Sequence, residues 1–433
     1  MHNLSILVLH SLGDPNCAPA FLKSHVYSLR NTFPQHIYIY HDTALPIPEY
    51  VKETQFDAIL LDVTFLCARW APENFLAKIK TDYDFVRQSD SVKIAFPQDQ
   101  YDCNEILDDW MIEWSVDVVF SVISSNWNVL YPRYHQQGEI KLGYTSYVDE
   151  PLIKIARKPF EQRTIDIGYR ARKLPPYFGK IGETKWTVGR DVAVLSRQAG
   201  LNVDIALGDQ GTLSGTAWLD FINNCKFTLG SNSGSSLLDP RGGIQQQVRA
   251  YLKNAPDAAF EDIERHCFSG LDGRYSFTAI SPRVLEAALL DSCQILVEGA
   301  YSGIIIPWEH YIPIRPDASN FAEVLLAMKD LDLVNRLIRN CRDAILDFDD
   351  LRQTTQASKV LNLVSDLVEK KRAVSNIENV VKVAAKYQRE MPARYIWHWR
   401  KIALRQHMIR TVDDYSFLSW VARKSLAAIR RYS

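Results

Sequence analysis

The chain has 433 residues, of which 47% are apolar and 23% charged, and its formal net charge at pH 7 is −1. This length predicts two or three domains, and the balance of apolar and charged residues is that of a globular protein with substantial cores, which excludes a disordered or fibrous chain. The seven cysteines are odd in number and include no CxxC pair, so neither a disulfide framework nor a zinc knuckle is indicated.

Cysteine usage and hydropathy favour a cytoplasmic protein. Scattered cysteines are typical of a reducing compartment. The chain opens with no basic leader followed by a long apolar core, and its apolar run at 58–68 is far shorter than the roughly 20 residues that span a bilayer. We therefore expect neither secretion nor integral membrane insertion.

The first 150 residues alternate between strand-like and helical patterns. Buried-strand runs are expected at 4–11, 36–41, 56–65, 92–97 and 116–123. Helical patterns separate them, at about 18–32, 72–88 and 104–114. Continuous apolar strands between amphipathic helices indicate a parallel sheet covered on both faces. Residues 1–150 are therefore expected to form one doubly wound, Rossmann-like domain.

A basic connector at 149–163 leads into a second alternating series. Strands are expected at 164–172, 202–207 and 293–298, and residues 225–236 read as a strand that runs into a Gly/Ser loop. Helices are expected at 181–199, 215–224, 281–291 and 319–329. An insertion with helical spacing occupies 244 to about 268. Residues 151–330 are expected to form a second Rossmann-like domain, and residues 331–433, whose apolar spacing is helical throughout, a basic helical tail.

The expected helix at 281–291 begins with residues suited to an anion. Ser281 is a good N-cap, Pro282 fits the first turn, and Arg283 adds a cation beside the positive end of the helix dipole. Glu286 lies one turn further in, where a carboxylate accepts hydrogen bonds from a ribose diol. The alternative is that these residues only start a helix.

The residues that follow resemble a known group of enzymes. Matching segments occur in order: Arg283, Glu286-Ala287-Ala288, the strand "CQILV", Pro307-Trp308-Glu309-His310-Tyr311, and Asp317 before Asn320-Phe321. This run of about fifty residues resembles the nucleotide-sugar half of GT-B glycosyltransferases, especially the spore-maturation-type and polysaccharide-assembling group. The chain departs from the group's E-x7-E pair, because the first position is Thr278, and "ALLDSC" replaces its usual "ACG" ending.

The resemblance implies a second basic element at the end of the strand at 164–172. In the group this strand ends in a turn that faces the diphosphate, and Arg170, Arg172 and Lys173 are the matching residues. Arg offers phosphate a bidentate fork and Lys a point charge, although a solvated basic turn would have the same composition. Because no DxD-like pair stands in this half, we expect a site that needs no metal ion and no cofactor.

The loop at 229–243 is rich in small polar residues. Gly230 and Gly234 allow a sugar or phosphate to approach the backbone, and Asp239 and Arg241 are candidates for contact with sugar hydroxyls. A plain flexible loop is the alternative. The sequence contains no GxGxxG and no P-loop motif, so it gives no separate indication of a dinucleotide site.

In the first domain, where the resemblance implies that an acceptor binds, a general base is expected at the end of a strand. His10 ends the first strand and Asp99 follows the fourth, with Asp102 behind it. A lone His or Asp at a strand end is also a common structural residue. Asp62 superficially resembles a receiver-domain phosphoacceptor, but the acidic cluster expected near the first strand is missing, and we reject that interpretation.

The tail is strongly basic. Residues 381–433 contain twelve Lys or Arg against three Asp or Glu, a net charge of +9, which leaves −10 for the rest of the chain. Aromatic and basic residues alternate at 393–412, as suits the headgroup layer of an anionic membrane. The alternative is a helix that packs its aromatic side onto the first domain. Nucleic-acid binding is disfavoured, because the body is acidic and shows no recognised motif.

Together these features predict a glycosyltransferase that moves a sugar from a nucleotide-sugar donor to a glycan or lipid-linked acceptor. The resemblance implies bacterial surface polysaccharide assembly, of lipopolysaccharide or capsule, by a cytoplasmic enzyme that is peripheral on the inner face of the membrane. Two alternatives stay open at this point. One is a nucleotide-sugar epimerase of the same fold, and the other is a non-catalytic scaffold that binds nucleotide or glycan.

Overall fold

The computed structural model describes residues 3–14, 18, 20–208, 211–213, 215–371 and 375–414, with side chains up to 405 in the last range and none for 20 and 21. Its first lobe is built on six strands. They are β1 (Ser5–His10), β2 (Ile37–Asp42), β3 (Ala58–Leu61), β4 (Val92–Ala95), β5 (Val118–Ser121) and β6 (Glu139–Leu142). All neighbours pair in parallel, in the order β2-β1-β3-β4-β5-β6.

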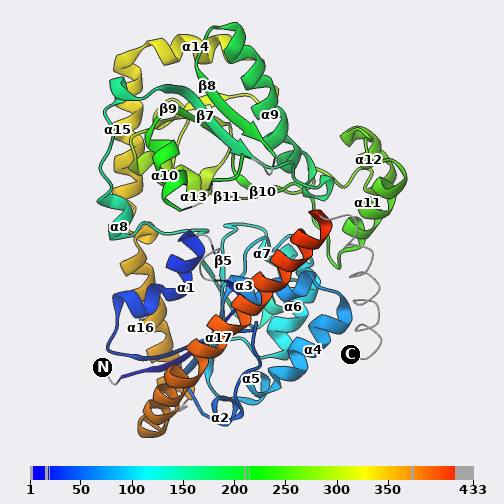
Figure 1. Ribbon diagram of the computed structural model, residues 1–433, viewed down its shortest axis with the longest axis vertical. Helices are drawn as coiled ribbons and strands as arrows, with labels where there is room; N and C mark the ends of the chain where they lie inside the picture. The colour runs from blue at the N-terminus through cyan, green and yellow to red at the C-terminus, as the bar shows by residue number, and fades with distance from the viewer. Residues whose placement is uncertain are drawn as a thin grey trace.

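The second lobe repeats this topology on five parallel strands (Figure 1). They are β7 (Ile165–Ala171), β8 (Val203–Leu207), β9 (Cys225–Gly230), β12 (Cys293–Val297) and β13 (Ile312–Ile314), in the order β13-β12-β9-β7-β8. Counted from each domain's own first strand, both sheets start 2-1-3-4-5. The topological switch points, where such sheets bind ligands, therefore lie between β1 and β3 and between β7 and β9.

Short helices connect the strands of the first domain. They are α1 (Ala20–Thr32), α2 (Glu49–Lys52), α3 (Val63–Leu66), α4 (Glu73–Asp82), α5 (Asp84–Gln88), α6 (Asn104–Glu113) and α7 (Trp127–Leu130), with α8 (Glu150–Ile153) at the connector. The strand expected at 56–65 ends at Leu61, because the carboxylate of Asp62 accepts a hydrogen bond from the Thr64 N–H at 2.9 Å and caps α3. The edge strand β6 was not predicted, since its four residues are exposed or half-buried and only two of them are apolar.

The second domain contains the expected helices and the insertion. The helices are α9 (Gly179–Gln198), α10 (Thr216–Asn223), α13 (Pro282–Leu289) and α14 (Phe321–Lys329), and the insertion holds α11 (Gly243–Asn254) and α12 (Phe260–Cys267). The insertion has its own apolar cluster around Val248, Ile263 and Phe268. A two-stranded antiparallel ribbon, β10 (Ser233–Ser235) and β11 (Phe277–Ala279), joins it to the start of α13.

The helices after residue 330 are divided between the two lobes. α15 (Leu331–Asp347) packs on α13 and β12 of the second domain. α16 (Gln353–Lys371) shares an apolar cluster with β1, β3 and β4, and α17 (Ile377–Asp414) crosses the first domain beside β2 (Figure 1). The expected fold class, two Rossmann-like doubly wound domains with a C-terminal helical extension, is confirmed. No helix in the described part of the chain is long and apolar enough to cross a bilayer.

Candidate functional site

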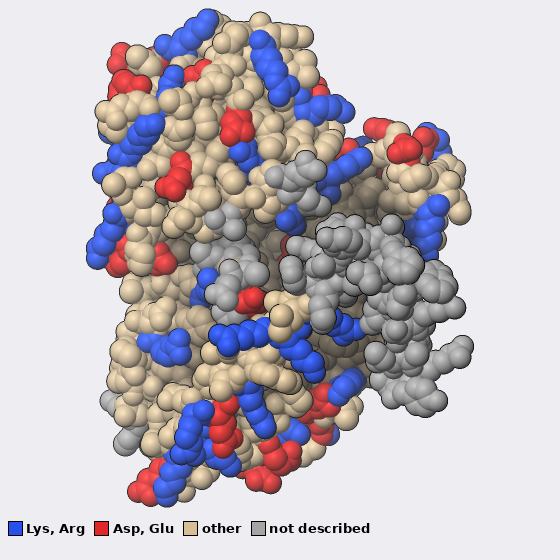
Figure 2. Space-filling model, viewed as in Figure 1, with Lys and Arg blue, Asp and Glu red and all other residues tan. Residues whose placement is uncertain are grey.

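The loops at the carboxyl ends of the two sheets meet. After β4, the chain of the first domain bonds to the loop that follows β9 in the second: the Asp239 N–H donates to the Tyr101 carbonyl at 3.0 Å, and the Cys103 N–H donates to the Asp239 carbonyl at 2.8 Å. Figure 2 shows the surface hollowed between the two lobes at this level. Residues at the ends of both sheets are therefore available to one site.

The start of α13 lies against the end of β7. Ser281 is the N-cap, as expected, and its hydroxyl accepts a hydrogen bond from the Arg283 N–H at 3.4 Å. The exposed Arg283 side chain donates from Nη1 to the main-chain oxygen of Arg170 at 2.5 Å. The first turn of α13 is thereby brought to the switch point between β7 and β9, and the structure joins two of the elements predicted for donor binding.

Glu286 belongs to the same group of side chains. Its Oε2 accepts a hydrogen bond from Nε1 of Trp218 at 2.7 Å, and the Arg283 guanidinium lies 5.2 Å from the centre of the Trp218 ring. Burial raises the pKa of the Glu286 carboxyl, while the Trp218 hydrogen bond and the charge of Arg283 oppose that rise. Trp218 was not among the predicted site residues, because it occupies an ordinary amphipathic position on α10.

Only part of the predicted basic turn, Arg170, Arg172 and Lys173, contacts the start of α13. The Arg170 guanidinium forms an ion pair with Asp204 at 2.8 Å and lies 4.0 Å from the Phe221 ring centre. Its charge is thus used inside the second domain, and only its main-chain oxygen meets Arg283. Arg172 is exposed and donates to the Thr212 hydroxyl at 3.2 Å, and Lys173 is exposed at the end of the turn.

A cation that was not predicted from the sequence stands between the domains. The Lys185 ammonium, on α9, interacts electrostatically with Asp99 of the first domain and with Arg283. Burial lowers its pKa to about 8. The available signal is periodicity, because Lys185 falls between Gly182 and Val188 on the buried side of α9. A lysine on the apolar stripe of a helix needs a charged partner or a ligand.

The loop after β9 serves mainly to hold the domains together. At Gly230, a Cβ would lie 2.8 Å from Cδ2 of Leu296 on β12, so this leucine side chain would have to shift. Arg241, a candidate for sugar contact, instead pairs with two carboxylates of α6, Glu105 at 2.8 Å and Asp109 at 3.0 Å. Asp239 accepts from the Gln245 N–H at 2.9 Å.

The two predicted bases have different surroundings. His10 is 4% exposed, with Nδ1 3.5 Å from the Asp42 carboxylate. Burial lowers its pKa, against the charges of Asp42 and Asp62. Asp99 is half-buried, with a φ of 46° that is uncommon for a residue other than glycine, and its Oδ1 accepts from the Tyr101 hydroxyl at 2.6 Å.

A buried arginine shapes the loop that carries Asp99. Arg69 is 1% exposed and donates to the main-chain oxygens of Gln98 at 2.7 Å, Asp99 at 3.0 Å and Asp102 at 3.1 Å. Asp102 also accepts a hydrogen bond from the Gln245 side chain. Burial raises the pKa of Asp102 to about 6, with a further rise from the neighbouring Asp239 charge, although Arg69 opposes the rise.

No protein-family model and no curated protein matches this sequence. Solved structures similar to the chain include an α-glucosyltransferase in complex with UDP and a 13-mer DNA, at 10% identity and a TM-score of 0.46, covering 84% of this chain and 99% of that one. Anabaena HepE in complex with UDP and glucose is 9% identical, with a TM-score of 0.47 and coverage of 84% and 100%. A glycosyltransferase from Rickettsia africae is 9% identical, with a TM-score of 0.43 and coverage of 85% and 99%. These likenesses assign no role to any residue of this chain.

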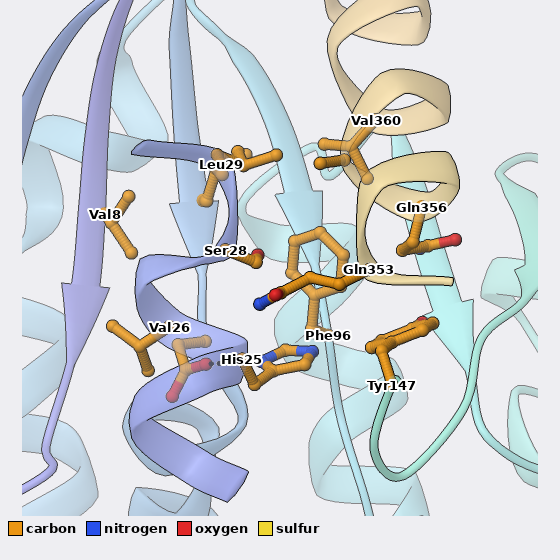
Figure 3. A pocket seen from close by; sticks show the side chains of 13 residues that line it. Val8, His25, Val26, Ser28, Leu29, Phe96, Tyr147, Gln353, Gln356 and Val360 are labelled. Carbon is orange, nitrogen blue, oxygen red and sulfur yellow. Dashed lines mark hydrogen bonds and ion pairs between the residues drawn. The ribbon is translucent and has the colours of Figure 1, made fainter. Parts of the chain in front are cut away.

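A cavity in the first domain lies between α1 and α16 (Figure 3). Its lining includes His25, Asp62, Phe96, Tyr147 and Gln353. Nδ1 of His25 lies 3.3 Å from Oδ2 of Asp62, and Figure 3 shows the imidazole with Phe96 and Tyr147 beside it. Burial raises the pKa of Asp62, but the bonds to His25 and Thr64 outweigh this effect and leave the pKa below its usual value. Asp62 therefore has a structural role, as helix cap and histidine partner.

Among the described residues, no cluster of three or more His, Cys, Asp or Glu side chains is arranged to hold a metal ion. The cations that surround the start of α13, Arg283 and Lys185, are groups that bind phosphate oxygens directly.

Proposed function

We propose that the protein is a glycosyltransferase that uses a nucleotide-sugar donor. One observation carries the proposal. At the interface of the domains, Arg283 of α13 donates from Nη1 to the Arg170 carbonyl near the end of β7 at 2.5 Å, and the charge of Lys185 acts on Arg283 and on Asp99 of the first domain. Two cations that lie near each other are costly without an anion, and the Asp99 charge of the first domain offsets part of this cost at Lys185. A diphosphate bound between Lys185 and Arg283 would supply the anion that these two cations need. An acceptor hydroxyl near Asp99 would be placed to give its proton to that carboxylate.

The donor is proposed to lie across the ends of β7 and β9. Arg283 and Lys185 would bind the diphosphate, and Arg172 and Lys173 would add positive charge from the turn after β7. Glu286 would accept hydrogen bonds from the ribose diol with Oε1, the carboxylate oxygen that does not bond Trp218. Ser281 and Gly230 keep α13 and β9 in the positions that this arrangement needs.

Catalysis would consist mainly of positioning and charge stabilisation. The bond between the anomeric carbon and the diphosphate oxygen breaks, and a bond from that carbon to the acceptor oxygen forms. The negative charge that develops on the departing nucleoside diphosphate is met by Arg283 and Lys185, without a metal ion. Asp99 is the proposed acceptor of the hydroxyl proton, with His10, whose pKa is lowered by burial, as the second candidate base.

The acceptor class and the pathway rest on the sequence resemblance alone. A glycan or lipid-linked acceptor, used in bacterial surface polysaccharide assembly at the cytoplasmic face of the membrane, is the proposal that fits the resembled group. No role for nucleic acid is proposed.

A panel of nucleotide sugars, incubated with the protein with and without glycan and lipid-linked acceptors, tests this function. Release of nucleoside diphosphate that depends on an acceptor, together with a glycosylated product, supports transfer. An epimerised sugar formed without acceptor would show a nucleotide-sugar epimerase instead. Binding without turnover over the whole panel would show a non-catalytic scaffold.

A further inference from the structure

Helix α17 presents an outward face that combines large apolar and basic side chains. Two rows at i, i+4 and i+8 run along it, Ile396-Arg400-Leu404 and Trp397-Lys401-Arg405. We call these six residues the α17 face. Ile396 is 55%, Trp397 66% and Leu404 63% exposed, and the three basic residues are exposed as well. The Lys401 ammonium lies 5.1 Å from the centre of the Trp397 ring.

The opposite side of α17 is anchored to the first domain. Tyr387 and Met391 are buried in the main apolar cluster of that domain. The Tyr395 hydroxyl donates to the Asp42 carbonyl at 2.8 Å and accepts from the Asp42 N–H at 2.9 Å. Because these contacts fix the rotation of the helix, the α17 face is held outward.

The anchored side also connects the helix to the proposed acceptor region. The Asp42 carboxylate accepts from the Gly13 N–H at 3.0 Å and lies 3.5 Å from Nδ1 of His10. The Trp399 ring covers Gly13, with ring carbons 3.8 Å and 4.0 Å from the place where a Cβ would stand. Whatever binds the α17 face therefore lies close to the loop that ends β1.

The positive charge of the α17 face indicates an anionic binding partner. Residues 391–412 include five Lys or Arg and no Asp or Glu. Trp and Arg or Lys side chains on one helical face suit the headgroup layer of an anionic bilayer, where the ring enters the interface and the cations meet lipid phosphates. Figure 2 shows Lys and Arg side chains along the side of the first domain that α17 crosses, with Asp and Glu side chains among them.

We infer that the α17 face docks the protein on an anionic lipid surface, and that the loop at the end of β1 is thereby held near that surface. This inference deepens the proposed function. It rests on that function only for the role of docking, which is to present a lipid-linked acceptor to the first domain. The docking itself depends on the α17 face and not on the donor site.

Vesicle cosedimentation of the full chain tests the inference. Phosphatidylcholine vesicles with and without phosphatidylglycerol are compared at low and high salt, for the wild type and for two double variants, Trp397→Ser with Leu404→Ser and Arg400→Gln with Lys401→Gln. Matched controls are Leu326→Ser, which changes a leucine of α14 that is 71% exposed, and Arg336→Gln with Arg339→Gln on α15. Circular dichroism and UDP binding are measured on each protein.

We expect binding that requires phosphatidylglycerol and weakens with salt. The variant Arg400→Gln with Lys401→Gln loses two cations that would lie near the lipid surface, so it should bind tenfold or more weakly than the wild type. The apolar variant should also bind more weakly, and both controls should bind as the wild type does. Equal binding to neutral and anionic vesicles, or wild-type binding by both variants, overturns the inference. The inference is also overturned if the variants lose self-association or binding of duplex DNA but keep vesicle binding. UDP binding reports on the donor site separately, so loss of one property does not imply loss of the other.

Discussion

Arg283 and Arg170 are linked through a side chain and a main-chain oxygen, not through two side chains. Nη1 of Arg283 donates to the Arg170 carbonyl at 2.5 Å, while the Arg170 guanidinium pairs with Asp204 at 2.8 Å. The two arginines therefore have separate tasks. One fixes α13 to the end of β7 and keeps its charge near the surface, and the other stabilises the second domain from within.

The first prediction follows from this division. Arg170→Gln should lower the free energy of unfolding by about 1 to 2 kcal/mol, because the ion pair with the half-exposed Asp204 and the contact with Phe221 are lost. Affinity for a nucleoside diphosphate should stay near that of the wild type. Urea denaturation and calorimetry on the same preparation separate these effects. Loss of affinity without loss of stability would instead show that Arg170 binds the donor.

Lys185 should affect binding and its pH dependence. Lys185→Met removes a charged donor worth about 1.5 to 3 kcal/mol, so whichever of UDP and GDP binds to the wild type should bind at least tenfold more weakly. Because the pKa of Lys185 is lowered to about 8, the ammonium loses its proton as the pH rises through 8. Wild-type affinity should thus fall between pH 7 and pH 9, and the variant's should change much less. Arg190→Gln, an exposed change on the same helix, is the control.

Trp218→Phe keeps the ring and removes the Nε1–H that Glu286 accepts. The unfolding free energy at pH 7 should fall by about 1 kcal/mol, since a largely buried carboxylate loses one donor while some solvent remains in reach. The pKa of Glu286, already raised, should rise further and be detectable by NMR titration. Trp308→Phe, at an indole that is 39% exposed, should change neither quantity. An unchanged pKa would mean that the indole hydrogen bond is absent in solution.

Replacing Asp102 should raise the free energy of unfolding, whereas Arg170→Gln and Trp218→Phe should lower it. Its pKa is raised from 3.8 to about 6, so the folded state holds the proton more tightly than the unfolded state, and ionisation above pH 6 opposes folding. This cost disappears as the pH falls below 3.8. Asp102→Asn should therefore stabilise the protein at pH 7.5, by up to about 3 kcal/mol, and by much less at pH 4.5. Destabilisation at pH 7.5 would contradict this assignment.

The fold was largely predictable because strand and helix periodicities are strong in both halves. The two parallel sheets, the insertion at 244–268 and the helical extension all follow from apolar spacing. Short or weakly patterned elements were missed. β6 reads "EIKL" with no buried residue, and Asp62 ended a strand that hydropathy extended to 65. The division of α15, α16 and α17 between two lobes depends on contacts far apart in the chain, which local patterns do not contain.

The site was less predictable, because charge in the sequence does not reveal its partner. Arg170 and Arg241 have the residue type that phosphate or sugar needs, yet both are paired with carboxylates from distant segments. Lys185 carries a detectable signal, a cation on the apolar stripe of a helix, but a local pattern does not show which charged group of the other domain lies near it. In α17, Tyr387, Met391 and Tyr395 pack on the first domain, as the packing alternative for the tail expects. Residues 396–405 are mostly exposed, and the membrane interpretation stays a prediction for them.

Calorimetric titration with UDP and GDP of the wild type, Arg283→Ala, Glu286→Ala and the exposed control Arg336→Ala tests the central claim most directly. We predict that one of the two nucleotides binds to the wild type and to the control with equal affinity. Both site variants, though folded, should bind it at least tenfold more weakly, as expected from loss of a charged hydrogen bond. Wild-type affinity in both site variants would contradict the placement of the donor at the start of α13.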